Sequence, residues 1–331
     1  MADFVNPGIL GSLAAFRSAF DSPISRSRDP NCSGREKMLG EARSKELTRL
    51  TSSFVLRRTA DLLRKFLPEK NELVVFCPLT TLQKTIYKAI LRSKAVSNLV
   101  ANSGTSSMGG IALSCLTKLK KVSNNPSLVF SDSKDGEKDV EDHDVLAHFP
   151  EDFDPIAAAI RPELSGKLLL LDQLVTAIVT KTSDKLVVVS NYTQTLDLLA
   201  SVFSCRGIKS LRLDGSLKST ERTALVDRFN ASYSTERIFL LSAQAGGVGL
   251  NLIGGNRLIL FDCSWNPGIA AVQLLSSVLL TAVSAVDIQA MARIWRDGQK
   301  KPVWIYRLLS VGSIDEKMFQ RQLRKQEARR V

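Results

Sequence analysis

The sequence predicts an α/β protein whose second half contains a parallel β-sheet. Two observations predict this class. From Ser165 onward, short apolar runs alternate with amphipathic stretches of helical period, as in strands that are joined by crossover helices. Polar and glycine residues follow the ends of these runs, which is where binding sites lie in parallel sheets. The length of 331 residues allows two domains, each with its own core.

The first half is predicted to be mostly helical. Residues 1–65 are mixed and basic, and the run from Ser22 to Arg35 is predicted to be a loop because it is rich in Pro, Ser and Arg. The elements expected next are a strand at Asn71–Cys77 and helices at Thr80–Ser93 and Ile111–Val122. A domain boundary is expected in or just after Ser131–Asp144, where Asp, Lys and Glu dominate.

Five strands and their connecting helices are predicted in the second half. The strands are Leu186–Ser190, Ser210–Leu213, Ile238–Ser242, Leu258–Asp262 and Val303–Leu308. The helices are Gln194–Phe203, Thr220–Phe229, one that contains Ile288, and a charged amphipathic helix at Ile314–Arg330. Because strands and helices alternate, the strands are expected to lie parallel in one sheet.

The composition indicates a globular protein with an anionic partner. The net charge of +12 favours a partner such as nucleic acid over an acidic one, although charge does not identify the partner. The five cysteines are scattered without a C-x-x-C pair, and His143 and His148 are the only histidines. Neither a disulfide framework nor a metal site is therefore predicted. The first residues lack the pattern of a secretory signal peptide.

The stretch Asp287–Gln299, which reads DIQAMARIWRDGQ, is the most informative motif from the residues alone. Written as one helix, it places Gln289, Arg293 and Arg296 on one face, at i, i+4 and i+7. The adjoining apolar stripe is predicted to contain Ile288, Met291, Ala292 and Trp295. Two guanidiniums one turn apart can bind phosphate oxygens in a bidentate manner. The alternative is a solvated basic stripe, which is the better interpretation of an isolated R-x-x-R.

Three further motifs follow predicted strands or precede a helix. Asn191-Tyr192-Thr193 could hold a phosphate or cap a helix, with equal support. Ser242–Asn251, which reads SAQAGGVGLN, is a glycine-rich turn whose backbone amides could approach a phosphate, but its spacing is not that of a dinucleotide fingerprint. Asp214-Gly215 is predicted to be a tight turn.

No segment of this sequence is predicted to bind ATP phosphates as a P-loop. Ser165-Gly166-Lys167 lacks the first glycine of that motif, a Ser or Thr after the Lys, and a preceding strand. There is also no Asp-Glu pair of the kind that holds a metal ion. These 331 residues are therefore not expected to position the β- and γ-phosphates and Mg²⁺ by themselves.

Several motifs together resemble a known family. They are FVLRRT…LPEK, LKKVSNNPSL, SGKL, VVVSNYTQTL, LDGS, LLSAQAGGVGLNLIGGNRLILFDCSWNP and DIQAMARIWRDGQKKPVWIYRLLSVGSIDEKMFQRQ. The sequence resembles the C-terminal half of Swi/Snf-type DNA translocases, over nearly its whole length. It is most similar to the recombination-repair branch, Rad54, and especially to the B-type paralogue. The resemblance implies a motor with two RecA-like lobes that hydrolyses ATP to move along double-stranded DNA.

The resemblance also implies roles for particular residues. Arg293 and Arg296 would be arginine fingers that reach from lobe 2 to the ATP held on lobe 1, with Gln289 in the same motif. The residues of the motif that links nucleotide and DNA would be Gly247, Gly249 and Asn251. DNA-backbone contacts would come from Asn191, Tyr192 and Thr193, and from Arg57 and Arg58 at the end of lobe 1.

The implied domain organisation has four parts. They are the tail of lobe 1 (1–76), a helical protrusion and linker (77–150), RecA-like lobe 2 (151–310), and a brace helix with a basic tail (311–331). An apolar segment at 268–286 has no counterpart in the family, and translated intron sequence explains it better than a natural insert. A membrane span there is disfavoured, because it would separate the arginine helix from its sheet.

The expected function is that of the second lobe of an ATP-dependent DNA translocase in homologous recombination and double-strand-break repair. ATP with Mg²⁺ would be bound mainly by lobe 1, so no ATPase activity is expected from this chain alone. Double-stranded DNA is the expected partner in the nucleus, with a strand-exchange recombinase and chromatin as further partners and no membrane. The alternative is a non-catalytic module that binds DNA or a recombinase.

Overall fold

The computed structural model describes residues 2–27, 32–56, 65–94, 96–97, 109–135, 145–245, 249–262 and 285–327. The polypeptide divides into two compact units, of which the first contains Met1–Lys65 and the second begins at Phe66. The predicted end of the lobe 1 tail, at residue 76, therefore differs from this division. The apolar segment predicted as an insertion at 268–286 lies outside the described residues, except for its last two positions.

The first unit consists of short helices that pack on one longer helix. The elements are α1 (Ala2–Val5), α2 (Leu13–Phe16), the π-helical η1 (Arg17–Asp21), α3 (Ser22–Arg26) and α4 (Gly34–Thr51). The loop predicted from Ser22 is thus wrong at its start, because α3 begins there. Helix α3 approaches α4 closely at Gly40, where an added Cβ would lie 2.2 Å from the Ser27 Cβ. A capping box between Ser33 and Glu36 starts α4.

The second unit contains a six-stranded sheet in the order β1-β6-β5-β2-β4-β3, and every neighbouring pair is parallel. The strands are β1 (Lys70–Cys77), β2 (Leu186–Ser190), β3 (Ser210–Leu213), β4 (Ile238–Ser242), β5 (Arg257–Leu260) and β6 (Val303–Ser310). The predicted α/β class is confirmed, and β2, β3 and β4 have the predicted bounds. Strand β5 ends before the predicted Asp262, and β6 continues beyond Leu308.

Strand β1 lies at one edge of the sheet, although the sequence assigned most of it to the tail of lobe 1. It pairs with β6 over its full length, from Lys70 opposite Val303 to Cys77 opposite Ser310. The apolar run before Pro78 predicted a strand here, but such a run carries no information about a partner at the other end of the chain. The sheet therefore contains residues from both halves of the sequence.

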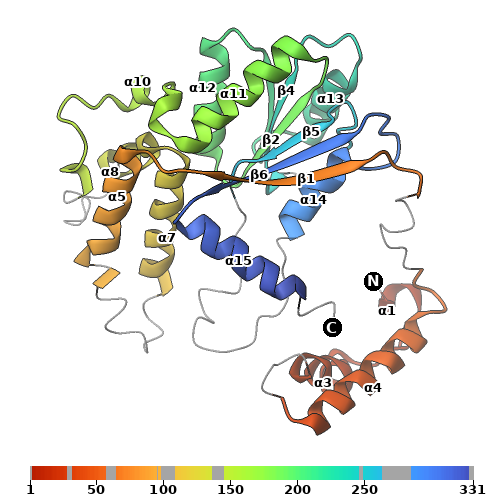
Figure 1. The fold of residues 1–331 in the computed structure, drawn as a ribbon. Coiled ribbons are helices and arrows are strands. Elements are labelled where there is room, and N and C mark those ends of the chain that lie inside the picture. Colours follow the sequence, from red (N-terminus) through yellow and green to blue (C-terminus); the bar gives the residue numbers. More distant parts are fainter. Residues whose placement is uncertain are drawn as a thin grey trace. The chain divides into compact units, whose positions relative to one another are not determined.

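Two pairs of helices cover the faces of the sheet (Figure 1). Helices α11 (Gly166–Lys181) and α12 (Thr193–Cys205) pack with one apolar cluster, which includes Leu168, Leu199 and Val188. Helices α13 (Ser219–Asn230) and α14 (Ala285–Ile294) pack with the cluster of the other face, which includes Phe229 and Ile294. Every residue of β2 and β4 is buried, as in a parallel sheet that is covered on both sides.

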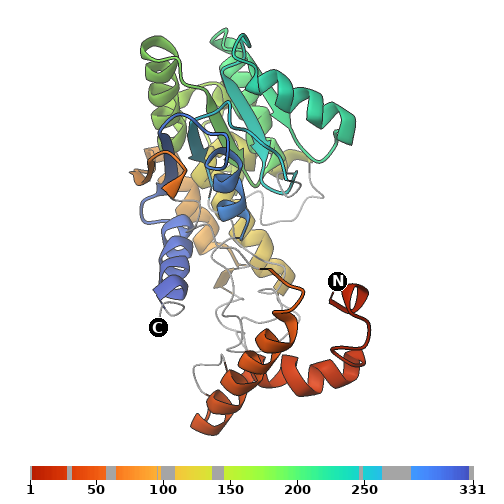
Figure 2. The ribbon, with the colours of Figure 1, turned by 90° about the vertical axis from the view of Figure 1, so that its right-hand side faces the viewer.

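The predicted helical protrusion is part of the same compact unit as the sheet. Its helices are α5 (Thr81–Arg92), α7 (Gly109–Asn124) and α8 (Pro126–Asp135), followed by α10 (Pro155–Ala159) and the 3-10 helix η4 (Pro162–Leu164). Three phenylalanines, Phe130, Phe149 and Phe153, pack with ring centroids 4.8 to 5.0 Å apart in its core. Helix α15 (Ile314–Glu327) contacts α7 and β6 (Figures 1 and 2). None of the helices in the described ranges has the length and apolar character needed to cross a membrane.

Candidate functional site

Helix α14 ends at Ile294, so the prediction that Arg296 lies on the same helical face as Gln289 and Arg293 is wrong. The last helical turn is completed by the amide of Trp295, which donates to the Met291 carbonyl at 3.1 Å. Gly298 then takes a φ of +92°, which is the left-handed conformation that commonly follows a helix. Arg296 therefore lies in the bend after the helix, where helical spacing does not determine the direction of its side chain.

The burial of α14 also differs from the prediction. Arg293 is only 9% exposed and lies on the buried side with Ala290 and Ile294. Gln289 and Ala292 are exposed, so the predicted apolar stripe is wrong at Ala292. The guanidinium of Arg293 thus reaches its position from the packed face of the helix and not from the solvent face.

Arg293 is a buried cation whose side chain lacks a full set of partners. Its Nε has no hydrogen-bond partner among the described residues. Burial first, and then the charge of Arg296, lower the pKa of the Arg293 guanidinium below its ordinary value. Burying an unpaired charge is unfavourable, and an anion would remove that penalty. The arrangement suits a negatively charged ligand.

The segment after β4 meets the end of α14. The amide of Leu252 donates to the Arg293 carbonyl at 3.0 Å, and Arg296 Nη1 lies 3.4 and 3.3 Å from the carbonyl oxygens of Gly249 and Leu250. Asn251 carries a second buried polar atom, Oδ1, without a partner among the described residues. We call Gly249, Asn251, Arg293 and Arg296 the arginine cluster. The structure brings these four predicted residues together, whereas Gly247 lies outside the described residues.

Two side chains that the sequence interpretation missed hold the arginine cluster in place. The Gln299 amide donates to the carbonyls of Ile253, Gly255 and Ile294, and its oxygen accepts from two backbone amides that follow it. Asp287, in the first turn of α14, forms an ion pair of 2.5 Å with Arg307 of β6. In the sequence, the signal for Gln299 was its position, as a polar residue directly after Gly298.

The predicted 191–193 turn lies at the carboxyl ends of β2 and β5, where it is held by Asp262. This buried carboxylate accepts from the Asn191 amide at 2.9 Å, from Asn191 Nδ2 at 2.5 Å and from Ser190 Oγ at 2.5 Å. The turn thus places Tyr192 at the N-cap of helix α12 without a side-chain cap, and the Asn191 side chain binds Asp262 instead. Thr193, the first residue of α12, is exposed.

Tyr192, like Asn191, is a partly buried member of the 191–193 turn. Lys120 Nζ lies 5.3 Å from the centroid of its ring. Burial first, and then the charge of Asp262, raise the pKa of the Tyr192 phenol. The hydroxyl therefore stays protonated at neutral pH and can donate a hydrogen bond.

Lys167 is a structural residue and not a phosphate ligand, which supports the rejection of a P-loop here. Gly166 opens α11 after the 3-10 helix η4, so no strand precedes it. Lys167 is 1% exposed, and its Nζ lies 2.5 Å from Asp315 Oδ2. Gly166 is required because an added Cβ would lie 1.9 Å from the Pro78 carbonyl oxygen. The predicted tight turn at Asp214 is confirmed, since its carboxylate accepts from the Ser216 amide at 3.0 Å.

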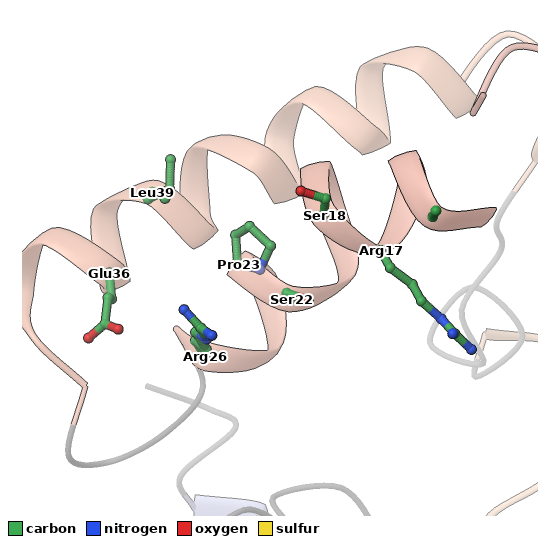
Figure 3. Close-up of a pocket in the computed structure, with 8 residues that line it drawn as sticks. Arg17, Ser18, Ser22, Pro23, Arg26, Glu36 and Leu39 are labelled. Carbon is green, nitrogen blue, oxygen red and sulfur yellow. The ribbon is translucent and has the colours of Figure 1, made fainter. Parts of the chain in front are cut away.

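The first unit has an open cavity of about 550 Å³ between α3 and α4. Its lining includes Arg17, Arg26 and Glu36 (Figure 3). Figure 3 shows Arg17 pointing away from the hollow. The charge of Arg26 acts on Glu36, whose carboxylate has the opposite sign. The cavity therefore has no cluster of like charges for an anionic ligand. Arg57 and Arg58, predicted to contact DNA, lie outside the described residues. Across the described ranges, no group of three His, Cys, Asp or Glu side chains could hold a metal ion.

Two family models match the sequence. The SNF2-related domain matches residues 1–128, and the Helicase conserved C-terminal domain matches residues 166–298. The first match covers the first unit, β1, α5 and α7, and the second covers β2 to β5 and the arginine cluster.

Curated relatives are similar over nearly the whole chain. It is 45% identical over 340 residues to "DNA repair and recombination protein RAD54B" of Mus musculus, covering 98% of this chain and 35% of the relative. It is 44% identical to "DNA repair and recombination protein RAD54-like" of Homo sapiens, covering 98% and 40%, respectively. The chain is 41% identical to "DNA repair protein rhp54" of Schizosaccharomyces pombe, covering 98% and 35%. It thus spans between a third and two fifths of the length of these relatives.

Solved structures with the same fold are ATPase domains, and they include a SWI2/SNF2 ATPase. The Sulfolobus solfataricus SWI2/SNF2 ATPase core in complex with double-stranded DNA has a TM-score of 0.55 and 28% identity, covering 96% of this chain and 55% of that one. The C-terminal part of the Fun30 ATPase domain has a TM-score of 0.55 and 26% identity, covering 77% and 89%. The predicted RecA-like fold class is confirmed by these similarities.

Proposed function

Because the chain belongs to the SNF2-related proteins of the Rad54 recombination-repair family, we propose that it is the second-lobe part of an ATP-dependent motor on double-stranded DNA. The observation that carries the proposal is Arg293, a buried guanidinium beside a second arginine, whose Nε has no partner in the part of the chain that the structure describes. The motor would act in homologous recombination and double-strand-break repair. A nuclear location, and a strand-exchange recombinase and chromatin as partners, belong to this proposal and are supported by the family alone.

The residues of the arginine cluster fit the phosphates of ATP. Bound ATP would supply the phosphoanhydride bond whose cleavage drives movement. Arg293 and Arg296 would stabilise the negative charge that develops on the transferred phosphoryl group, because guanidiniums stay charged and match the geometry of phosphate oxygens. Arg293 gains a partner for its buried charge in the process. Gln289 is exposed on the same helix and would be a further contact to the nucleotide.

The adenosine phosphates and Mg²⁺ would be held by lobe 1. A P-loop does not occur within these 331 residues, and Asp315-Glu316 lies in the first turn of α15, where Asp315 forms an ion pair with Lys167. An arginine finger contributes nothing to hydrolysis without the phosphate that it stabilises. These residues alone are therefore proposed to bind DNA without turning over ATP.

The 191–193 turn would contact the DNA backbone. It presents the exposed Thr193 and the first amides of α12 at the carboxyl end of the sheet, where parallel sheets bind their ligands. The net charge of +12 favours the phosphates of a duplex. Contacts to phosphate release counterions, so the affinity should fall steeply as salt rises.

The test joins this chain to a lobe that can hold ATP. The chain would be fused behind the P-loop lobe of the mouse relative, and its DNA-stimulated ATP turnover would be measured. Removing an arginine finger costs about 10³-fold or more in turnover, so Arg293→Lys and Arg296→Lys should each abolish most of it. Arg161→Lys, an exposed position that pairs with Glu163, serves as the control. Full turnover in both variants would show that the arginine cluster has no role in catalysis. Duplex binding by the fusion without any turnover would favour the non-catalytic alternative.

A further inference from the structure

Five segments of the second unit meet in one buried polar network. Its members come from the start of α15, the first turn of α11, the end of α7 and the ends of β5 and β2, in the order Asp315, Lys167, Asn124, Asp262 and Asn191. The first four side chains are at most 2% exposed. We call these five residues the Asp262 network.

The contacts run in an unbroken sequence from α15 to the 191–193 turn. Lys167 Nζ lies 2.5 Å from Asp315 Oδ2 and donates to Asn124 Oδ1 at 3.1 Å. Asn124 Nδ2 donates to Asp262 Oδ2 at 3.2 Å. Asp262 Oδ1 then accepts from the Asn191 amide at 2.9 Å. Each donor therefore faces an acceptor, and charges of opposite sign alternate along the network.

Position 124 requires a side chain that accepts at one end and donates at the other. Asn has both functions, because its oxygen faces the Lys167 ammonium and its NH₂ group faces the Asp262 carboxylate. The opposite orientation would place the NH₂ group against the ammonium and the oxygen against the carboxylate. An ionised Asp could not donate at all. The direction of the network is thus set by the chemistry of its central residue.

The backbone around Asn124 is also held. Ser165 Oγ donates to the Asn124 carbonyl at 2.6 Å, and Gln83 Nε2 donates to the Val122 and Ser123 carbonyls at 2.8 and 3.2 Å. At the other end, the Ile314 amide donates to the Tyr87 hydroxyl at 2.8 Å. The protrusion and the start of α15 are therefore fixed to the same point as the strand ends.

We propose that Asp315, Lys167 and Asn124 are positioning residues for the 191–193 turn, which they hold through Asp262. The terminal helix α15 and the protrusion thereby determine the geometry of a surface that neither of them forms. The inference rests on the proposed function, because duplex binding by the 191–193 turn is part of that proposal. The positioning itself can be measured without DNA.

The experiment substitutes Asp315, at the α15 end of the Asp262 network, and measures the effect in the 191–193 turn, at the other end. Asp315→Asn removes the charge at α15 and keeps the volume. Backbone hydrogen exchange of the Asn191 and Tyr192 amides is then measured in the 331-residue chain. We expect their exchange to accelerate about tenfold, because the carboxylate that accepts the Asn191 amide loses its fixed position. Asn124→Leu interrupts the network directly and should accelerate it further.

A matched control separates positioning from a general loss of stability. Asp184→Asn removes the same charge from an ion pair with Arg257, at 2.6 Å, next to the amino end of β5. It should leave the ratio of Asn191 exchange to exchange in the centre of β2 unchanged. If Asp315→Asn does not fold, the pair Lys167→Met with Asp315→Leu replaces both charges by apolar groups, which buried ion pairs often tolerate. This double variant should fold and still show fast exchange at Asn191.

Duplex affinity of the same variants distinguishes failure of this inference from failure of the proposed function. Faster exchange with weaker duplex binding supports both. Faster exchange with unchanged duplex affinity supports the positioning and removes the 191–193 turn from DNA binding. Unchanged exchange at Asn191 in the folded Asp315 and Asn124 variants would overturn the positioning, whatever the duplex affinity.

Discussion

The arginine cluster and the Asp262 network are two polar sites in one unit, and they differ in how their charges are matched. In the Asp262 network, the Lys167 ammonium faces Asp315, and Asp262 accepts from four donors. In the arginine cluster, two guanidiniums lie close together, and Arg293 Nε and Asn251 Oδ1 lack partners among the described residues. The Asp262 network thus pairs its buried cation with a carboxylate of this chain, although Asp315 Oδ1 lacks a hydrogen-bond partner among the described residues. The unmatched site has the chemistry of a surface that is completed by an anion.

The largest effect is expected at the matched site. Lys167→Met leaves the Asp315 carboxylate buried without its cation, so the free energy of unfolding should fall by about 3–5 kcal/mol. Urea denaturation measures this loss. Lys181→Met, in the exposed last turn of the same helix, should change stability by less than about 0.5 kcal/mol. An equal, small effect of both substitutions would show that the Asp262 network does not stabilise the fold.

An intermediate effect is expected at Gln299, which supports the arginine cluster from below. Gln299→Ala leaves the carbonyls of Ile253, Gly255 and Ile294 without a donor, so stability should fall by about 2–3 kcal/mol. Thermal or urea unfolding measures the change. Gln320→Ala, on the exposed side of α15, is the control and should have almost no effect. A neutral Gln299→Ala would mean that water replaces the lost donors at little cost.

The opposite sign is expected within the arginine cluster itself. Arg293→Met removes an incompletely paired buried cation, so the ligand-free chain should become more stable, by about 1 kcal/mol. Arg321→Met, at an exposed position of α15, provides the control for the loss of one positive charge. A clear loss of stability in Arg293→Met would show that the guanidinium is already satisfied. The contrast between the two sites would then disappear.

Much of the sheet was predictable from the sequence, because its central strands are short apolar runs between polar turns. Strands β2 and β4 have the predicted bounds, since all of their residues face a covered side. The error at Arg296 has a local cause, because helical spacing was extended past Ile294, where α14 ends. The family resemblance named the members of the arginine cluster, but not that Arg293 is buried.

The Asp262 network was not predictable, because its contacts join residues that are far apart in the sequence. Asn124 and Asp262 are separated by 138 positions. In the sequence, Lys167 belonged to the family motif SGKL and resembled an incomplete P-loop, and neither pattern pointed to Asp315 or Asn124 as its partners. The partners of a buried charge are set by the tertiary fold, whereas sequence periodicity reports only which side of an element faces the core.

The smallest effect tests charge matching at a third site, near the amino end of β4. The Ser234 hydroxyl first, and then Arg228, lower the pKa of the Glu236 carboxyl to about 2, from an ordinary value of 4.5. Because the folded-state pKa is depressed, the stabilisation is complete above pH 4.5 and is lost as the pH falls toward 2. The difference in unfolding free energy between the parent and Glu236→Gln should therefore shrink across this window. A difference that stays constant from neutral pH to pH 2 would show that Glu236 contributes through packing and not through its charge.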